Sequence, residues 1–140
     1  MSLTRTYAGR ATYYPDHWYE QHLLFVVAAC FVGDRPVEAM LDTGSQWCIL
    51  PVEFATDLGY GAHDEESDTR LHTRFGTITG RLVRIPLRFR AEEGRQVTVE
   101  ATWFISEGWP GPPVLGWKGC LERIRFALDP GEESFYFAEL

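Results

Sequence analysis

The residues Asp42-Thr43-Gly44-Ser45 stand at the end of an apolar run and occur once in the chain. A carboxylate held in such a tight turn can exchange protons with a bound water when a second carboxylate lies beside it. Two like charges about 3 Å apart cannot both ionise, so the pair shares one proton. The chain has no second Asp-Thr-Gly or Asp-Ser-Gly, so a second copy of the chain would have to supply the partner. The alternative is an ordinary polar turn, because Asp and Gly are common turn residues.

The composition predicts one domain, residues 1–140, with a substantial core, because 45% of the 140 residues are hydrophobic and 14% aromatic. The net charge of −7 argues against a nucleic-acid partner, which normally requires a basic patch. No apolar stretch approaches the ~18 residues of a membrane span. The first residues lack the apolar segment of a signal peptide, so we expect a cytoplasmic protein.

Metal and cofactor sites are not indicated by the sequence. The three cysteines, Cys30, Cys48 and Cys120, have no paired spacing, so they outline neither a disulfide framework nor a zinc site. His63 and His72 lie near acidic residues, but their spacing matches no standard ligand pattern. There is no phosphate-binding glycine loop. We therefore expect no metal and no cofactor.

The elements around the motif must position Asp42. Apolar segments 22–32 and 37–41, joined by a turn with Gly and Pro, predict a hairpin that delivers Asp42 at its end. A short strand over 47–50 and a short helix over 52–58 follow, since Pro suits the first helical turn and Gly the stop position. Further segments predict strands over 4–14, 82–89, 97–105, 125–129 and 135–138, a hairpin over 69–80 and a short helix over 117–124. Many short strands with regular turns are typical of an all-β barrel or sandwich.

Three blocks in order make the chain resemble the retropepsins, the single-domain aspartic peptidases, and their cellular and bacterial relatives. The first runs over 39–51 and continues into a short helix closed at 58–60, and the second, His72 to Gly80, is similar to the flap and its return strand. The third is Val114-Leu115-Gly116, followed by a helix and by 125–129. In this family such an apolar-apolar-Gly element lies across the strand that bears the catalytic Asp. The resemblance implies an all-β, retropepsin-like closed barrel (the acid protease fold) with one or two short helices, functioning as a symmetric homodimer.

The resemblance also implies an aspartic endopeptidase, a hydrolase that cleaves peptide or protein substrates. Asp42 of each of two chains would hold one water, one carboxylate acting as base and the other as acid. Thr43 would lock the two active turns together, Gly44 would allow close approach of the backbone, and Ser45 would donate a hydrogen bond to Asp42. A flap would close over an extended substrate. The expected flap residues are Phe75, Gly76 and Ile78, and the expected cleft wall is Trp109, Val114, Leu115 and Gly116.

Two departures from the retroviral pattern keep other hypotheses open. Retroviral members carry Gly-Arg-Asp or Gly-Arg-Asn where this chain has Gly116-Trp117-Lys118, and an Asp where it has Gln46. In the family that Arg and Asp form an ion pair, so its loss puts a retroviral style of dimer and subsite in doubt. The second hypothesis is therefore a catalytically inactive peptide-binding or dimerisation module of the same fold. The third is an unrelated β-barrel that binds a small ligand. Roles in turn, strand or core packing also fit some of the named residues: Thr43, Ser45, Trp109, Val114 and Leu115.

Overall fold

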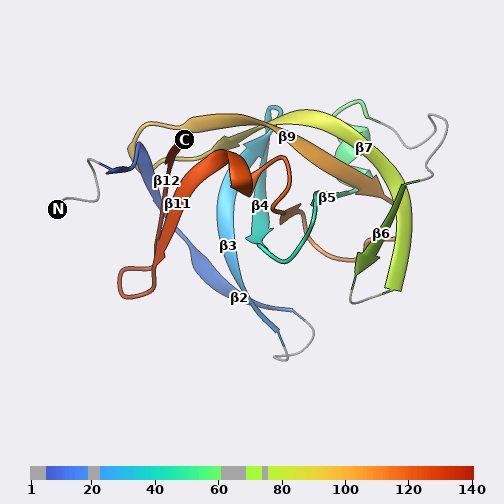
Figure 1. Cartoon of the computed structure of the whole chain (residues 1–140), viewed down its shortest axis with the longest axis horizontal. Helices are drawn as coiled ribbons and strands as arrows, with labels where there is room; N and C mark the ends of the chain where they lie inside the picture. The colour runs from blue at the N-terminus through green and yellow to red at the C-terminus, as the bar shows by residue number, and fades with distance from the viewer. Residues whose placement is uncertain (1–5, 19–22, 61–68, 74–75) are drawn as a thin grey trace.

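The computed structural model describes residues 6–18, 23–60, 69–73 and 76–140. Strands dominate these residues and the helices among them are short (Figure 1). The elements are β1 (Gly9–Thr12), β2 (Tyr14–Trp18), β3 (Leu23–Val32), β4 (Arg35–Leu41), β5 (Cys48–Pro51), α2 (Val52–Asp57), β6 (Thr69–Thr73), β7 (Gly76–Phe89), β8 (Glu93–Gly94), β9 (Val97–Ser106), β10 (Val114–Leu115), a 3₁₀ helix (Leu121–Arg123), β11 (Ile124–Asp129) and β12 (Ser134–Glu139).

Six strands form a closed barrel. The larger sheet has the order β2-β3-β4-β10-β5-β9-β7-β6, and an additional pairing between β3 and β7 joins its two halves. That pairing sets Cys30 opposite Phe89 and Val32 opposite Leu87, so the ring runs β3-β4-β10-β5-β9-β7 and returns to β3. Closure leaves no free edge within the ring, which is how small barrels avoid edge-to-edge aggregation. The predicted all-β closed barrel with few helices is confirmed.

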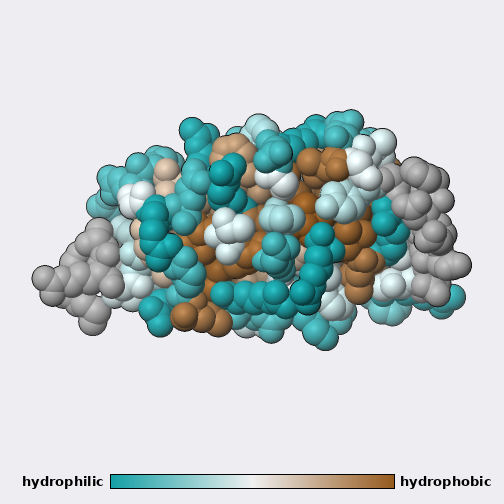
Figure 2. All heavy atoms as spheres, turned by 90° about the horizontal axis from the view of Figure 1, so that it is seen from above, coloured by the Kyte–Doolittle hydropathy of each residue, from teal (hydrophilic) through white to brown (hydrophobic). Residues whose placement is uncertain are grey.

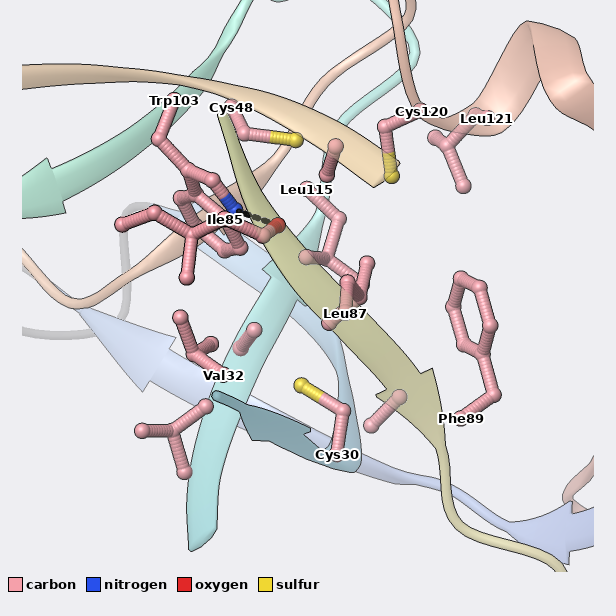
Figure 3. Close-up of a cluster of buried hydrophobic side chains, with 14 of the residues drawn as sticks. Cys30, Val32, Cys48, Ile85, Leu87, Phe89, Trp103, Leu115, Cys120 and Leu121 are labelled. Carbon is pink, nitrogen blue, oxygen red and sulfur yellow. Dashed lines mark hydrogen bonds between the residues drawn. The ribbon is translucent and has the colours of Figure 1, made fainter. Parts of the chain in front are cut away.

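The barrel interior is filled by the inward residues of alternating strands. In β7, Ile85, Leu87 and Phe89 are at most 1% exposed, whereas the residues between them face outward. Figure 3 shows Ile85 beside Trp103 of β9, whose indole Nε1 donates a hydrogen bond to the carbonyl oxygen of Ile85 at 3.2 Å. Each such side chain contributes about 1.5–3 kcal/mol through burial. On the face seen in Figure 2, hydrophilic side chains surround a band of apolar atoms.

A second sheet of four strands, in the order β11-β12-β1-β8, packs beside the barrel. The terminal strand β12 pairs with β11 on one side and with β1 on the other. Its Phe135 and Phe137 rings lie 5.7 Å and 5.5 Å from the ring of Phe89, so the aromatic contacts join this sheet to the barrel core. Both edges of β12 are therefore occupied within its own chain.

Two sequence predictions need correction. The hairpin over 69–80 is confirmed as β6 and β7, but β7 continues without a break into the segment predicted as a separate strand over 82–89. Gly80 is the residue at which β7 changes partner from β6 to β9, and a Cβ there would lie 2.2 Å from the carbonyl oxygen of Ile105. The glycine thus marks a close backbone approach, not a turn.

The short helix predicted over 117–124 is also wrong. Turns occupy 117–120 and only a single 3₁₀ turn, Leu121–Arg123, follows. Gly119 has a φ of +76°, a left-handed conformation that an α-helix does not contain. The glycine therefore prevents the helix that the neighbouring residues would favour.

Candidate active site

The β3–β4 hairpin places Asp42 at one end of the barrel. The two strands pair in register from Val32 opposite Arg35 to Val26 opposite Leu41. Gly33 at the turn has a φ of +59°, which suits a tight hairpin connection. Asp42 follows directly after β4, and its backbone N–H donates to the carbonyl oxygen of Leu115 at 3.0 Å. The predicted hairpin that delivers the carboxylate is confirmed.

The active turn is held by its own hydrogen bonds. Gly44 N–H donates to Oδ1 of Asp42 at 2.9 Å, and Ser45 N–H donates to the carbonyl oxygen of Asp42 at 3.1 Å. A Cβ on Gly44 would lie 3.2 Å from Oδ1, so a side chain there would crowd the carboxylate. The Ser45 hydroxyl donates to the carbonyl oxygen of Trp47 at 2.7 Å. The expected donation from this hydroxyl to Asp42 is therefore wrong; a backbone N–H takes that role.

The segment that follows β10, Gly116 to Lys118, acts as a clamp that holds the active turn through backbone hydrogen bonds. Val114 and Leu115 pair in parallel with Met40 and Leu41, as the resemblance implied for an apolar-apolar-Gly element. Trp117 N–H donates to the carbonyl oxygen of Ser45 at 2.8 Å. Lys118 N–H donates to the carbonyl oxygen of Gln46, also at 2.8 Å. Backbone hydrogen bonds thus hold the active turn at the positions where the retroviral Arg and Asp are absent.

Gly116 explains why this clamp can lie so close to the turn. A Cβ on Gly116 would lie 2.2 Å from the carbonyl oxygen of Trp47 and 2.9 Å from that of Ser45. Both atoms belong to the backbone, which cannot rotate away as a side chain can. Only glycine fits at this contact.

A hollow of about 370 Å³ opens over Asp42. Trp109 and Val114, two of the residues expected on the cleft wall, line it together with Ile49 of β5. Leu115 lies instead in the main core with no exposed surface, and Gly116 lies beneath the turn. Asp42 itself is half-buried, so its carboxylate is accessible to a molecule in the hollow. Thr43 is exposed beside it.

Strand β6, in the hairpin expected to be the flap, forms the other wall of this hollow. β6 contributes Arg70, Leu71, His72 and Thr73, and the pairing of β6 with β7 forms the predicted flap hairpin. Gly76 has a φ of +105° at the start of β7. Ile78 is 8% exposed and packs in a cluster with Leu71 and Trp109, and so it supports the flap base more than its tip. Phe75, the third predicted flap residue, lies outside the described residues.

Sequence reasoning missed several residues of the hollow. Apart from Gln46, which follows the motif, they lie on strands whose position relative to Asp42 only the fold defines: Ile49, Arg70 and Leu71. The alternation of polar and apolar residues over 69–73 was the available signal, and it identified the strand but not what it faces.

The described residues offer no alternative metal or thiol chemistry. No group of three His, Cys, Asp or Glu side chains among them could hold a metal ion. His72 is paired through Nδ1 with the Thr77 hydroxyl at 2.7 Å, and His63 lies outside the described residues. Burial, followed by the neighbouring Cys48, raises the pKa of Cys30 to about 12. A hydrogen bond with the Cys48 thiol and burial raise the pKa of Cys120. These thiols, at the core positions in Figure 3, are unsuited to nucleophilic attack.

Comparisons with known proteins agree with this geometry. A sequence model of a family described as aspartyl protease matches residues 27–118. A retropepsin-like aspartic protease from Rickettsia conorii superposes with a TM-score of 0.61 at 17% identity, covering 93% of this chain and 90% of that one. The retroviral protease-like domain of Ddi1 from Leishmania major gives a TM-score of 0.57 at 15% identity, covering 83% and 94%. A search of curated proteins found no match.

Fold and site therefore define a protein of the retropepsin-like class. Because the family match spans well over half of the chain, the protein belongs to this aspartyl protease family. None of the helices among the described residues is long and apolar enough to cross a membrane.

Proposed function

We propose that the protein is an aspartic endopeptidase in which Asp42 of each of two identical chains acts on one water molecule. The observation that carries the proposal is the carboxylate of Asp42, half-buried at the floor of an open hollow and held through Oδ1 by Gly44 N–H. Family membership supports it. A single carboxylate per chain supplies only half of an acid–base pair, so the partner comes from a second copy.

In the proposed reaction, the ionised carboxylate takes a proton from the water, which attacks the carbonyl carbon of the scissile peptide bond. The protonated carboxyl group of the other chain donates a hydrogen bond to the carbonyl oxygen and polarises it. The C–N bond of the resulting tetrahedral intermediate then breaks, and the carboxyl group that received the proton of the water passes it to the nitrogen of the leaving amine. The Gly44 N–H stabilises negative charge on its own Asp42 and fixes the orientation of that carboxylate. Thr43, exposed next to Asp42, is placed to contact the facing turn of the second chain.

A peptide substrate would lie extended between the active turn and β6. Leu71, Ile49 and Val114 give the hollow an apolar lining for side chains, and the backbone of β6 offers pairing for the substrate backbone. Closure of the β6–β7 hairpin would exclude water from the reacting atoms. We also propose that residues 1–140 form one domain. The proposed location of the protein is the cytoplasm.

The proposed homodimer cannot use β12 as an added strand, because both of its edges are paired within its own chain. In this proposal the two chains meet through the surface around Asp42 itself. Mass measurement in solution tests this step: a dimer is expected, and a protein that stays monomeric at high concentration would contradict the proposal.

Asp42→Asn tests the chemistry. The substitution keeps the shape and the acceptor for Gly44 N–H but removes the ionisable group, so peptide cleavage should fall by a factor of about 10² to 10⁴. Glu38→Gln, a charge loss on the exposed side of β4, is the matched control and should leave cleavage unchanged. Cleavage that survives Asp42→Asn would overturn the proposal.

A second candidate, a peptide-binding or dimerisation module without catalysis, is favoured by one observation. Trp117 and Gln46 stand where retroviral members place the Arg and the Asp of a charged pair, and only backbone hydrogen bonds join the two segments here, from Trp117 N–H to Ser45 and from Lys118 N–H to Gln46. Such a module would bind peptides as a dimer and cleave none of them across a range of pH.

A further inference from the structure

A second hollow, of about 450 Å³, lies on the outer face of β7 and β9. Leu82 and Arg84 of β7 form one wall, and the segment that follows Gly116 forms the other with Lys118 and Arg123. Trp47, two residues beyond Ser45, completes it. Nothing in the proposed catalytic step uses this hollow.

The turn that shapes the hollow is fixed by backbone contacts. Gly119, at a φ of +76°, lies so close to β9 that a Cβ would be 2.7 Å from the Thr102 hydroxyl. Leu121 N–H and Glu122 N–H donate to the carbonyl oxygens of Gly116 and Trp117 at 3.1 Å and 3.0 Å. The hollow therefore exists before any ligand arrives, which lowers the entropic cost of binding.

The hollow is cationic in a protein whose net charge is −7. Arg84, Lys118 and Arg123 face one carboxylate, Glu122, and that carboxylate already accepts a hydrogen bond from Gly119 N–H. Lys118 Nζ lies 5.2 Å from the centre of the Trp47 ring. Arg123 Nη1 donates to the carbonyl oxygen of Glu100 at 3.2 Å. Within the described part of the chain none of the three cations forms an ion pair, so their charge is available to an anionic ligand.

The second hollow adjoins the first. Gln46 lines the hollow over Asp42, and the next residue, Trp47, lines the cationic one. Trp47 also packs on the apolar cluster that contains Ile49, Val114 and Trp109, three of the apolar residues that line the hollow over Asp42. Lys118 N–H is bonded to Gln46, so the loops that bear the two hollows form one unit.

We propose that the cationic hollow is an outer subsite that binds a carboxylate side chain of the peptide whose scissile bond lies at Asp42. An extended chain leaving the first hollow past Gln46 reaches it a few residues from the cleaved bond, since each residue advances about 3.3 Å. Arg84 and Lys118 bind the Asp or Glu side chain, and Trp47 and Leu82 contact its methylene groups. The inference rests on the proposed peptidase function and adds a preference for acidic peptides.

Paired peptides test the preference. Each pair differs only by Glu against Gln at one position, and the position is moved outward from the scissile bond on both sides. At one position we expect kcat/KM to favour Glu by about fivefold, the upper range for exposed charge pairs, and the ratio to fall with added salt.

Charge reversal identifies the residues. Arg84→Glu with Lys118→Glu should invert the preference to Gln, and the milder Arg84→Gln with Lys118→Gln should abolish it if the reversed protein folds poorly. Arg88→Glu is the matched control, because Arg88 lies on β7 over the ring of Phe31, outside both hollows, and should keep the Glu preference. If the preference for Glu over Gln is equal in all variants, or absent in the native protein, the proposed subsite is overturned. Peptide cleavage in the same experiment would still support the proposed peptidase function.

A binding measurement separates the two proposals when no peptide is cleaved. Fluorescence anisotropy of a labelled Glu-containing peptide is followed with the Asp42→Asn protein, with and without Arg84→Gln and Lys118→Gln. Salt-sensitive binding that those changes weaken at least about threefold supports the subsite without catalysis. Binding that is indifferent to salt and to both substitutions overturns it.

Discussion

Gly116→Ala tests whether the clamp under the active turn is as tight as the geometry indicates. The added Cβ would lie 2.2 Å from the carbonyl oxygen and 2.4 Å from the carbonyl carbon of Trp47. Real Cβ atoms do not come so close to backbone, so one of the two segments must move. The segment that moves carries either Asp42's turn or the Trp117 and Lys118 N–H groups that hold it.

The expected cost follows from these contacts. Forcing one methyl group into a packed site costs about 1–3 kcal/mol. Weakening the hydrogen bonds from Trp117 to Ser45 and from Lys118 to Gln46 costs about 1 kcal/mol each. Since the shift that relieves the overlap also lengthens those bonds, we expect a total loss near 3 kcal/mol in the free energy of unfolding. Cleavage should fall more than stability alone explains, because the carboxylate is displaced.

Urea unfolding monitored by tryptophan fluorescence gives the free energy, and kcat/KM on a reference peptide gives the activity. Gly131→Ala is the control: it lies in an exposed turn, its Cβ would meet only Asp129 Oδ1 at an ordinary 3.4 Å, and its φ is not in the left-handed region. That variant should be unchanged or more stable by up to about 1 kcal/mol. Equal effects of the two substitutions would refute the steric argument.

Three further outcomes are expected. Ser45→Ala should lower the free energy of unfolding by about 1 kcal/mol, because the hydrogen bond from the hydroxyl to the Trp47 carbonyl oxygen is lost. The pH profile of cleavage should stay unchanged, and a shifted profile would mean that the hydroxyl donates to Asp42 after all. Trp103→Phe should cost about 2–4 kcal/mol in urea unfolding, since it leaves a cavity and removes the hydrogen bond from the indole to the Ile85 carbonyl oxygen, and a near-neutral result would contradict that packing. The hydrogen bond from Arg95 lowers the pKa of Glu139 from 4.5 to about 2. The stabilisation of the folded protein by this ion pair is therefore complete above pH 4.5 and is lost as the pH falls through 2. Glu139→Gln should differ from the native protein in thermal unfolding near pH 6 and match it below pH 2.

The parts of the fold that local patterns decide were predictable from the sequence. The hairpin ending at Asp42, the helix over 52–57 and the stop at Gly59, whose φ is +89°, follow from turn residues and hydrophobic runs. The points at which strands end or continue were not predictable from local patterns in the same way. The hairpin was predicted to end at Gly80, although the close approach of β9 requires a glycine inside a continuous strand, and that approach is a tertiary contact.

The site was predictable where a motif names its residues and unpredictable where the fold alone brings them together. Asp42, Gly44 and Val114, which the resemblance named, line one hollow, because the parallel pairing of β10 with β4 brings Val114 beside the motif. The Ser45 hydroxyl donates its hydrogen bond to the carbonyl oxygen of Trp47, and which acceptor it reaches depends on the backbone conformation of the turn. The cationic hollow joins β7 to a turn 34 residues further along, from Arg84 to Lys118, and no local pattern indicates such a pairing.

Subunit mixing tests the central claim, that two Asp42 carboxylates from two chains act together, most directly. Native protein is combined with Asp42→Asn protein, the chains are allowed to exchange, and cleavage is measured at constant total concentration. If both carboxylates are required, a mixture containing half native chains should retain about one quarter of the native activity, the share of chains paired native with native. Retention of about one half, in proportion to the native chains present, would show that each chain acts alone and would contradict the account.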